Sequence, residues 1–202
     1  TEDKVIIENG LLGEKYQIET FDFTDQIIGF DKIKELSLIV YGDDRGNTIK
    51  GIDENSNTLY GWELNDYLDG GNLTDYIYGG TGNDVLVGAA GSDVLKGNTG
   101  SDTFYFASDS ADNSTDTIVD FANGDTIDLS DLLEGESATA DSLAGYLQFS
   151  FDGTDTLISI DKDKDGSTDL TIKLSGVDLV GDALDDSAVI QKLLDEAKLT
   201  VD

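Results

Sequence analysis

A nine-residue repeat between Gly61 and Tyr105 constrains this chain more than any other feature. Each line begins with Gly, places Asp at its sixth position and places an apolar residue at its eighth. The line Gly79-Gly-Thr-Gly-Asn-Asp-Val-Leu-Val shows the pattern in full. Gly, Asn and Asp tolerate positive φ, so each line predicts a six-residue turn followed by a three-residue strand.

Strands this short are stable only when they are stacked on one another. A weaker register continues upstream, with Asn47 in one line and Asn57 in the next, which carries one inserted residue. We therefore expect a solenoid in which one nonapeptide forms half a coil and a coil takes 18 residues. The residues expected to fill its interior are Ile49, Leu59, Leu68, Ile77, Leu86, Leu95 and Phe104.

The charge of the chain excludes several classes of function. Lys and Arg number 12 against 43 Asp and Glu, a formal charge of −31. Nucleic acids and anionic lipids require a basic face, so neither is an expected partner. No apolar run reaches the length of a membrane span, so we expect no membrane insertion. With no His and no Gly-x-Ser-x-Gly motif, we expect no enzyme.

The repeated Asp residues predict a metal site. Residues 18 apart stack in the expected solenoid, which places Asp66 on Asp84, Asp75 on Asp93 and Asp84 on Asp102. Bare carboxylates at strand spacing repel each other, whereas a hard cation between them reverses the sign of the interaction. Ca²⁺ suits such a site better than Mg²⁺, which demands octahedral geometry. The alternative is that these residues only cap tight turns.

Main-chain oxygens of the turns are the remaining candidate ligands, because glycine-rich turns let carbonyls face inward. Asn57 lies above Asp75 and predicts a weaker first site, whereas the insertion predicts that Asn47 is out of step with Asp66. The candidate side-chain ligands are Asp66, Asp75, Asp84, Asp93, Asp102 and Asn57, and the candidate carbonyls are those of Gly70, Asn72, Gly79, Thr81, Asn83, Gly88, Ala90, Ser92, Gly97, Thr99 and Ser101.

The repeat resembles the nonapeptide of the RTX, or haemolysin-type, calcium-binding family. The line from Gly79 matches it at every defined position. The resemblance implies an all-β fold, a right-handed parallel β-roll with several Ca²⁺ ions in its turns. Because the ends of a solenoid expose strand edges, we also expect β-rich caps at both ends, and the pattern near the C-terminus predicts a short helix. We expect an N-terminal β cap at 1–40, the β-roll at 41–106 and a capping and secretion-targeting region at 107–202.

The segment after the repeats resembles the C-terminal targeting region of type I secreted proteins, in the version found on large bacterial adhesins. The residues concerned are Asp102-Thr-Phe-Tyr-Phe, Asp116-Thr-Ile-Val-Asp-Phe and Gly124-Asp-Thr-Ile-Asp-Leu. This resemblance implies export by an ABC transporter complex to the bacterial surface or medium. Upstream, Ile18-Glu-Thr-Phe-Asp-Phe-Thr-Asp25 resembles a strand pair that precedes such arrays, and Val5–Ile7, Tyr16–Ile18 and the stretch around Ile27 look β-like.

Two further features lie near the C-terminus. Strand-like segments bracket a loop that begins Asp-x-Asp-x-Asp-Gly, like an EF-hand, but it lacks Glu at position twelve. The loop predicts either a calcium site or a solvated turn, and its acids are Asp161, Asp163, Asp165 and Asp169. From about Asp185 to Leu199 the pattern predicts an amphipathic helix that packs on its own domain or is read by the transporter.

Three functions remain open. The first is a calcium-dependent secretion and folding module of a large adhesin. The second is a surface-recognition solenoid that binds ice or another ligand, although the outward turn pairs vary too much for a regular lattice. The third is the non-catalytic tail of an RTX protease or lipase. The chain starts at Thr1 rather than Met, so we expect an excised, monomeric fragment.

Overall fold

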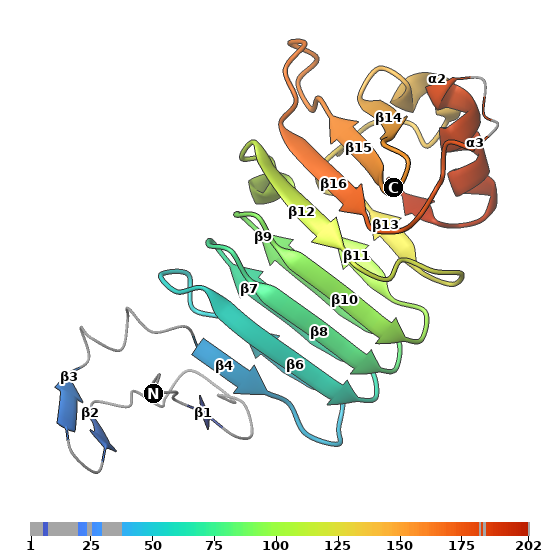
Figure 1. The fold of residues 1–202 in the computed structure, drawn as a ribbon. Coiled ribbons are helices and arrows are strands. Elements are labelled where there is room, and N and C mark those ends of the chain that lie inside the picture. Colours follow the sequence, from blue (N-terminus) through green and yellow to red (C-terminus); the bar gives the residue numbers. More distant parts are fainter. Residues whose placement is uncertain are drawn as a thin grey trace.

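A computed structural model describes residues 38–201 apart from Asp182 and Leu184, together with the backbone at 6–7, 20–23 and 26–29. Two sheets face each other across a narrow interior, and most of their strands are parallel (Figure 1). The chain alternates between the sheets along the repeats, so that each nonapeptide contributes one strand. This arrangement confirms the predicted parallel β-roll.

In the described residues the larger sheet has nine strands, and from β4 to β12 it contains every second strand of the chain. In spatial order they are β1 (Ile6–Ile7), β4 (Leu38–Tyr41), β6 (Asn57–Glu63), β8 (Tyr76–Thr81), β10 (Val94–Thr99), β12 (Ser114–Ile118), β16 (Leu170–Leu174), β15 (Thr156–Ile160) and β14 (Leu147–Phe151). Pairing is parallel from β1 to β16 and antiparallel from β16 to β14.

The smaller sheet has six strands, all parallel in the pairs that join them. Their order is β17 (Leu199–Thr200), β13 (Thr126–Asp128), β11 (Thr103–Tyr105), β9 (Val85–Ala89), β7 (Tyr67–Gly71) and β5 (Thr48–Lys50). The register pairs Leu68 with Leu86 and Leu86 with Phe104, so the coil is 18 residues long in the repeats.

One apolar residue from each repeat strand points into the interior. Leu59, Leu68, Ile77, Leu86, Leu95 and Phe104 have no exposed surface, and Ile49 is 5% exposed, as predicted. Complete burial of such a side chain contributes about 1.5–3 kcal/mol. The core continues beyond the repeats through Ile118 and Ile127 into the C-terminal region.

The N-terminal cap is described only in part. Ile6–Ile7 forms β1, which extends the larger sheet by pairing in parallel with β4. The predicted strand pair is present as β2 (Thr20–Phe23) and β3 (Gln26–Gly29), which are antiparallel and include Ile27. The β-like run predicted at Tyr16–Ile18 lies outside the described residues.

The C-terminal region closes the roll with an antiparallel hairpin and helices (Figure 1). The helical segments are η1 (Ser108–Ser110), α2 (Ala140–Leu143) and α3 (Asp186–Asp195). The Asp185 side chain caps α3 by accepting the Ala188 N–H at 3.0 Å, and Val189, Ile190 and Leu193 are buried. No helix in the described part of the chain is long and apolar enough to cross a membrane.

The predicted extent of this helix is wrong at its end. Helix α3 stops at Asp195, the backbone of Ala197 turns to φ 53°, and Leu199 enters β17 beside β13. Burial of Leu199 on the interior side of the smaller sheet favours the strand, because the open edge of β13 supplies a ladder that another helical turn would lose.

Candidate metal centre

Two columns of acidic side chains run along the roll, one at each row of turns. The first column consists of Asn47, Asp66, Asp84, Asp102 and Asp125, and the second of Asn57, Asp75, Asp93 and Asp116. In every step, one carboxylate Oδ1 accepts the main-chain N–H of the column residue in the coil before it, at 2.5–3.0 Å. The predicted stacking of Asp66 on Asp84, Asp75 on Asp93 and Asp84 on Asp102 is therefore present.

The second oxygen of most of these carboxylates has no partner. Residues of the columns are at most 4% exposed from Asp66 onward, so water does not reach them freely. Among the described residues, five column oxygens are buried without any hydrogen bond, the Oδ2 atoms of Asp66, Asp75, Asp84, Asp93 and Asp116. A buried polar atom without a partner costs about 1–3 kcal/mol, and more when it is charged. The columns therefore have the chemistry of a cation site.

Glycine at the start of each line makes room for these oxygens. A Cβ placed on Gly79 would lie 2.4 Å from Asp84 Oδ2 and 2.9 Å from the Gly97 carbonyl oxygen. A side chain therefore does not fit, and both the carboxylate and a neighbouring carbonyl crowd the same space. The same contact recurs at Gly61, Gly70, Gly88 and Gly97 against the aspartate of their own line.

Burial makes these carboxylates resist ionisation in the absence of a metal. Desolvation raises the pKa of Asp75, Asp84 and Asp102 to about 6 and that of Asp116 to about 7. Desolvation, followed by the charge of Asp116, raises the pKa of Asp93 to about 9. The pKa of Asp66 is raised for the same main reason. A bound cation would remove this penalty.

Asn57 occupies the column position before Asp75, and its side-chain amide places an N–H donor among the oxygen acceptors of the turn. Its Nδ2 donates to Asp75 Oδ1 at 2.9 Å and to the carbonyl oxygens of Gly70 at 2.9 Å and Asn55 at 2.8 Å, while its Oδ1 accepts the Ile52 N–H. In this structure the Asn57 amide is fully engaged in these hydrogen bonds, and its role as a metal ligand stays a prediction. The surroundings of its Nδ2 are nevertheless all oxygen acceptors.

The prediction that Asn47 is out of step with Asp66 is wrong. Its N–H donates to Asp66 Oδ1 at 2.7 Å, and Thr48 pairs with Tyr67. The inserted residue is absorbed in the turn before β6, where the Asn55 N–H bonds to the Ile52 carbonyl oxygen at 3.0 Å. Strand register is thus preserved because the turn lengthens instead.

Sequence reasoning missed Asp116 and Asp125 as members of the columns. They follow Asp93 and Asp102 by 23 residues rather than 18. Both begin an Asp-Thr-Ile triplet that matches Asp102-Thr-Phe, and this similarity was the available signal. The Asp125 Oδ2 accepts the Ala122 N–H at 2.8 Å, so only Asp116 adds a free oxygen.

The predicted carbonyl ligands divide between strands and turns. Gly70, Gly79, Thr81, Gly88, Gly97 and Thr99 lie within strands β7 to β10, whereas Asn72, Asn83, Ala90, Ser92 and Ser101 lie in the turns. The Gly70 carbonyl accepts from Asn57, and the Thr99 carbonyl accepts the Gly82 N–H at 2.9 Å. These two carbonyls are therefore already engaged.

The predicted loop lies in the hairpin between β15 and β16. Carboxylate oxygens of Asp161, Asp163 and Asp169 lie within 4.8 Å of one another, and the fourth predicted residue, Asp165, is not in this group. The Asp161 carboxylate already accepts the N–H groups of Asp165 at 3.1 Å and Gly166 at 2.9 Å. Unlike the columns, this loop is largely exposed and satisfies its acids with main-chain donors.

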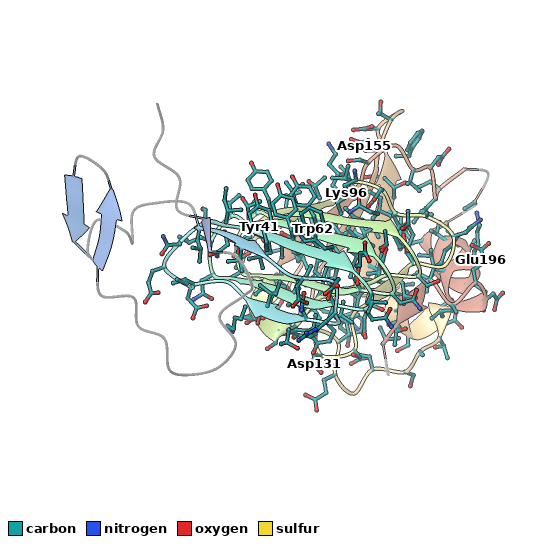
Figure 2. The ribbon with its side chains drawn as sticks, turned by 90° about the horizontal axis from the view of Figure 1, so that it is seen from below. Tyr41, Trp62, Lys96, Asp131, Asp155 and Glu196 are labelled. Carbon is teal, nitrogen blue, oxygen red and sulfur yellow. The ribbon has the colours of Figure 1, made fainter. Side chains whose placement is uncertain are left out.

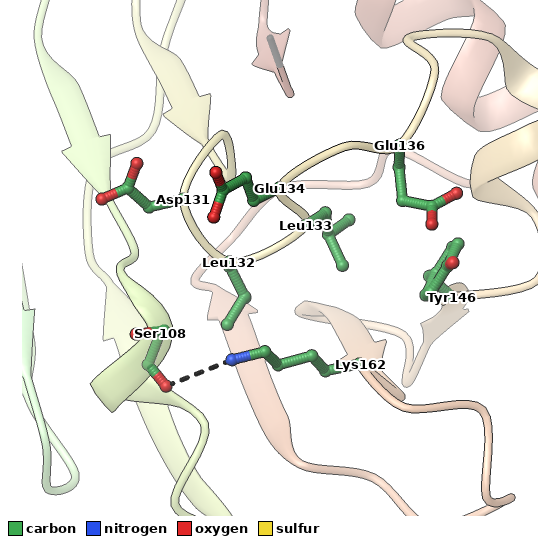
Figure 3. A pocket seen from close by; sticks show the side chains of 8 residues that line it. All are labelled: Ser108, Asp131, Leu132, Leu133, Glu134, Glu136, Tyr146 and Lys162. Carbon is green, nitrogen blue, oxygen red and sulfur yellow. Dashed lines mark hydrogen bonds between the residues drawn. The ribbon is translucent and has the colours of Figure 1, made fainter.

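A separate pocket of about 370 Å³ lies under the C-terminal region (Figure 3). Asp131, Glu134 and Glu136 line it together with Lys162, whose Nζ donates to the Ser108 carbonyl oxygen at 3.5 Å. No predicted site residue lines this pocket, and its acids do not form a group that converges on one point. The columns are therefore the better candidate site.

Comparison with known proteins identifies the family. The model of the peptidase M10 serralysin C-terminal family matches residues 46–191, which cover both columns and most of the C-terminal region. The chain belongs to this family of RTX-type β-rolls. A search of curated protein sequences gives no match.

Two solved structures are similar to the chain, both from the mannuronan C5-epimerase of Azotobacter vinelandii. The solution structure of the AlgE6R3 subunit is 30% identical, with 67% of this chain and 73% of that chain covered, at a TM-score of 0.44. The AlgE6R2 subunit is 22% identical, with 82% and 92% covered, at a TM-score of 0.42.

Proposed function

We propose that this chain is a calcium-binding module that folds when its two aspartate columns take up Ca²⁺. The observation that carries the proposal is the set of five buried Oδ2 atoms without a partner. Asp66, Asp75, Asp84, Asp93 and Asp116 would hold the ions, with carbonyl oxygens of the turns completing the ligand sets. Bound Ca²⁺ supplies positive charge to a space that otherwise contains only acceptors.

Calcium is favoured over other cations by the donor set. Every candidate donor is a carboxylate or carbonyl oxygen, and the chain contains no Cys or His to attract softer metals. The crowded, irregular turns suit the six to eight flexible ligands of Ca²⁺ better than the octahedron of Mg²⁺. The Asn57 amide in the equivalent space supports a requirement for positive charge rather than for a particular geometry.

The hairpin loop is the candidate for a separate, weaker calcium site. Asp161, Asp163 and Asp169 are its proposed ligands, because only these three converge. Their exposure and their existing bonds to main-chain N–H groups reduce the gain from an ion. Loss of this site would leave the columns unaffected.

We further propose that the module acts in secretion, at the C-terminal end of a large cell-surface or secreted adhesin. The resemblance of the segment around 102–133 to type I targeting regions supports export through an ABC transporter complex. Extracellular calcium modules bind at about 10⁻⁴–10⁻³ M, so sites of that strength stay empty inside a cell and fill outside it. Folding coupled to binding would then oppose return of the chain.

A second parent protein is favoured by the family match. The family is described as the C-terminal region of M10 peptidases, so a secreted peptidase that carries this chain as its non-catalytic tail is the alternative to an adhesin. In both cases the chain itself binds calcium and performs no catalysis. An export assay with a reporter fused to the chain tests the secretion role in either context.

The calcium role is tested by circular dichroism and calorimetry during a calcium titration of the full chain. We expect a transition from coil to β structure between about 10⁻⁵ and 10⁻³ M calcium. Magnesium at the same concentrations should not produce it. A chain that is compact in excess chelator, and unchanged by calcium, would disprove the proposal.

A further inference from the structure

An aromatic groove lies on the outer face of the larger sheet, away from the aspartate columns. It has a volume of about 570 Å³ and crosses strands β4, β6, β8 and β10. Tyr41, Tyr60 and Tyr78 form one wall, with neighbouring rings stacked at 5.0 and 4.8 Å between centroids. Figure 2 shows Tyr41 and Trp62 on the same side of the roll as Lys96 and opposite Asp131.

Trp62 forms the other wall in a backbone conformation that disfavours a side chain. Its φ is 84°, and its register partner in the next coil is Gly80, with φ 120°. Trp62 is 57% exposed, and its ring is tilted against that of Tyr41 at 6.3 Å between centroids. Glycine would adopt this positive φ without strain. The presence of tryptophan instead therefore indicates that the side chain itself has a role.

The remaining lining is polar but uncharged. The hydroxyls of Thr81 and Thr99 and of the three tyrosines have no hydrogen-bond partner among the described residues. The Asn98 side-chain amide makes one bond there, at 3.5 Å, while its main-chain N–H donates to Asp120 Oδ2 at 2.9 Å. The chain has 43 acidic residues, yet no carboxylate and no ammonium group lines the groove. The groove therefore offers apolar ring surfaces and free hydroxyls to an uncharged ligand.

The extent of the groove indicates a chain-like ligand. Four neighbouring strands span about 14 Å at the usual strand separation. All four are paired on both sides, so they expose no free backbone edge to which a peptide strand could add. A ligand with alternating apolar faces and hydroxyls, extended across these strands, matches the lining better than a peptide.

We propose that this groove binds a short stretch of an uncharged polysaccharide. Trp62 and the tyrosine wall would pack against the apolar faces of the sugar rings, because aromatic rings combine large contact area with few rotatable bonds. Thr81, Thr99 and Asn98 would bond to sugar hydroxyls. The groove uses the side chains of Thr81 and Thr99, whereas the calcium prediction concerns their main-chain carbonyls, and none of the column aspartates lines it. Binding requires the folded roll.

Trp62 is the single tryptophan of the chain, so its fluorescence reports the groove directly. The calcium-loaded chain is titrated with soluble glucan, mannan and galactan oligosaccharides and, separately, with polygalacturonate. We expect a saturable change in Trp62 emission with at least one uncharged sugar and none with polygalacturonate. Calorimetry on the same samples gives the affinity.

The test variant is Trp62→Gly, which restores the residue type of Gly80 and removes the backbone strain. Because this variant has no tryptophan emission, its binding is measured by calorimetry, and sugar binding should weaken at least tenfold. The calcium-induced circular dichroism transition should still occur. Thr99→Val should weaken binding severalfold. Tyr67→Ala is the matched control, because Tyr67 is an aromatic residue 40% exposed on β7 of the other sheet, and binding should be unaffected.

Three results would overturn the proposal. The first is the absence of binding by every uncharged sugar of the panel. The second is binding of polygalacturonate alone, which would indicate a charged ligand. The third is equal binding by Trp62→Gly and the unaltered chain, which would place the sugar elsewhere.

Discussion

The repeat coils and the C-terminal region bury polar groups in opposite ways. In the coils that carry the aspartate columns, from the repeats through β12, five buried carboxylate oxygens have no partner among the described residues. In the C-terminal region, Asp155 pairs with Lys173 at 2.7 Å and accepts the Gly176 N–H at 2.9 Å, and the Thr156 hydroxyl bonds to the Val177 carbonyl oxygen at 2.7 Å. The oxygens without a partner extend along the columns as far as Asp116 in β12, and the buried hydroxyls of Ser110 and Ser114 have no partner there either. Beyond β12, the buried groups of Asp155 and Thr156 are bonded within the chain.

This difference indicates where a calcium dependence would reside. A region whose polar groups are paired keeps its stability when metal is withdrawn, whereas unpaired buried carboxylates repel and favour unfolding. The C-terminal region would then serve as a fixed end on which the coils stack. The following experiments separate the two regions, beginning with the largest expected effect.

Chelation of the full chain should abolish hydrogen-exchange protection in the coils while sparing part of the C-terminal region. Strands β7 to β11 lose protection because their columns lose the cation, and the β14–β15 hairpin with α3 keeps a larger share. Exchange measured by mass spectrometry with and without calcium resolves the segments. Uniform loss of protection in both regions would erase the contrast.

The pH dependence of the metal-free chain should run opposite to ordinary acid denaturation. Burial raises the folded-state pKa values of the column carboxyls to about 6 for Asp84, about 7 for Asp116 and about 9 for Asp93, above the ordinary value of an aspartate carboxyl. The folded state therefore binds more protons than the unfolded state, and the stability of the coils present near pH 4 is lost as the pH rises through that range. Circular dichroism of the chelated chain between pH 4 and 9 measures it.

Calcium binding should show the complementary trend. Since the ion displaces protons from the columns, the calcium midpoint should fall as the pH rises through the same interval. A midpoint that does not change between pH 5 and 8 would mean that the column carboxylates do not bind the ion.

Asp93→Asn should raise the calcium concentration at the midpoint by about tenfold or more, a loss of metal affinity typical of altered metal-site residues. Without calcium the same variant should be more ordered at pH 8 than the unaltered chain, because it removes the column carboxyl with the highest raised pKa. Calorimetry and circular dichroism measure the two effects. Asp109→Asn, in η1 outside the columns, is the matched control and should change neither.

Asp161→Asn should have the smallest effect. We expect the calcium stoichiometry to fall by at most one ion, with the midpoint and cooperativity of the coil transition unchanged. The exposed hairpin loop satisfies its acids with main-chain donors, so its folding does not depend on an ion. A large shift in the coil transition would show that loop and columns are coupled.

The parts of this structure predictable from sequence were those set by a constant period. The 18-residue stacking was predictable because each line has Gly, Asp and an apolar residue at the positions of Gly79, Asp84 and Leu86. A strict period of this kind allows only one alignment of the short strands. Asp116 and Asp125 were not predicted as column residues because they follow Asp93 and Asp102 by 23 residues rather than 18. The alignment of Asn47 with Asp66 was not predicted for the same reason. The number of residues between two positions does not show which turn contains the inserted residue.

Other features depended on contacts that a one-dimensional pattern does not contain. The stacking of Tyr41 on Tyr60 and Tyr78 requires strand register as well as spacing, and the left-handed backbone of Trp62 is visible only beside Gly80. Helix α3 ends where it does because Leu199 pairs with the open edge of β13. In each case tertiary pairing outweighed local periodicity.

The insertion before β6 and the longer connection between Asp102 and Asp116 leave both columns in register. The strands and column residues thus keep their register when a connecting turn becomes longer, because the extra residues are accommodated in the turn. New peptide sequence placed between Ala107 and Asn113 should be carried on the surface without shifting the strands on either side. A protein built on this plan can acquire surface features one turn at a time while its interior stays the same.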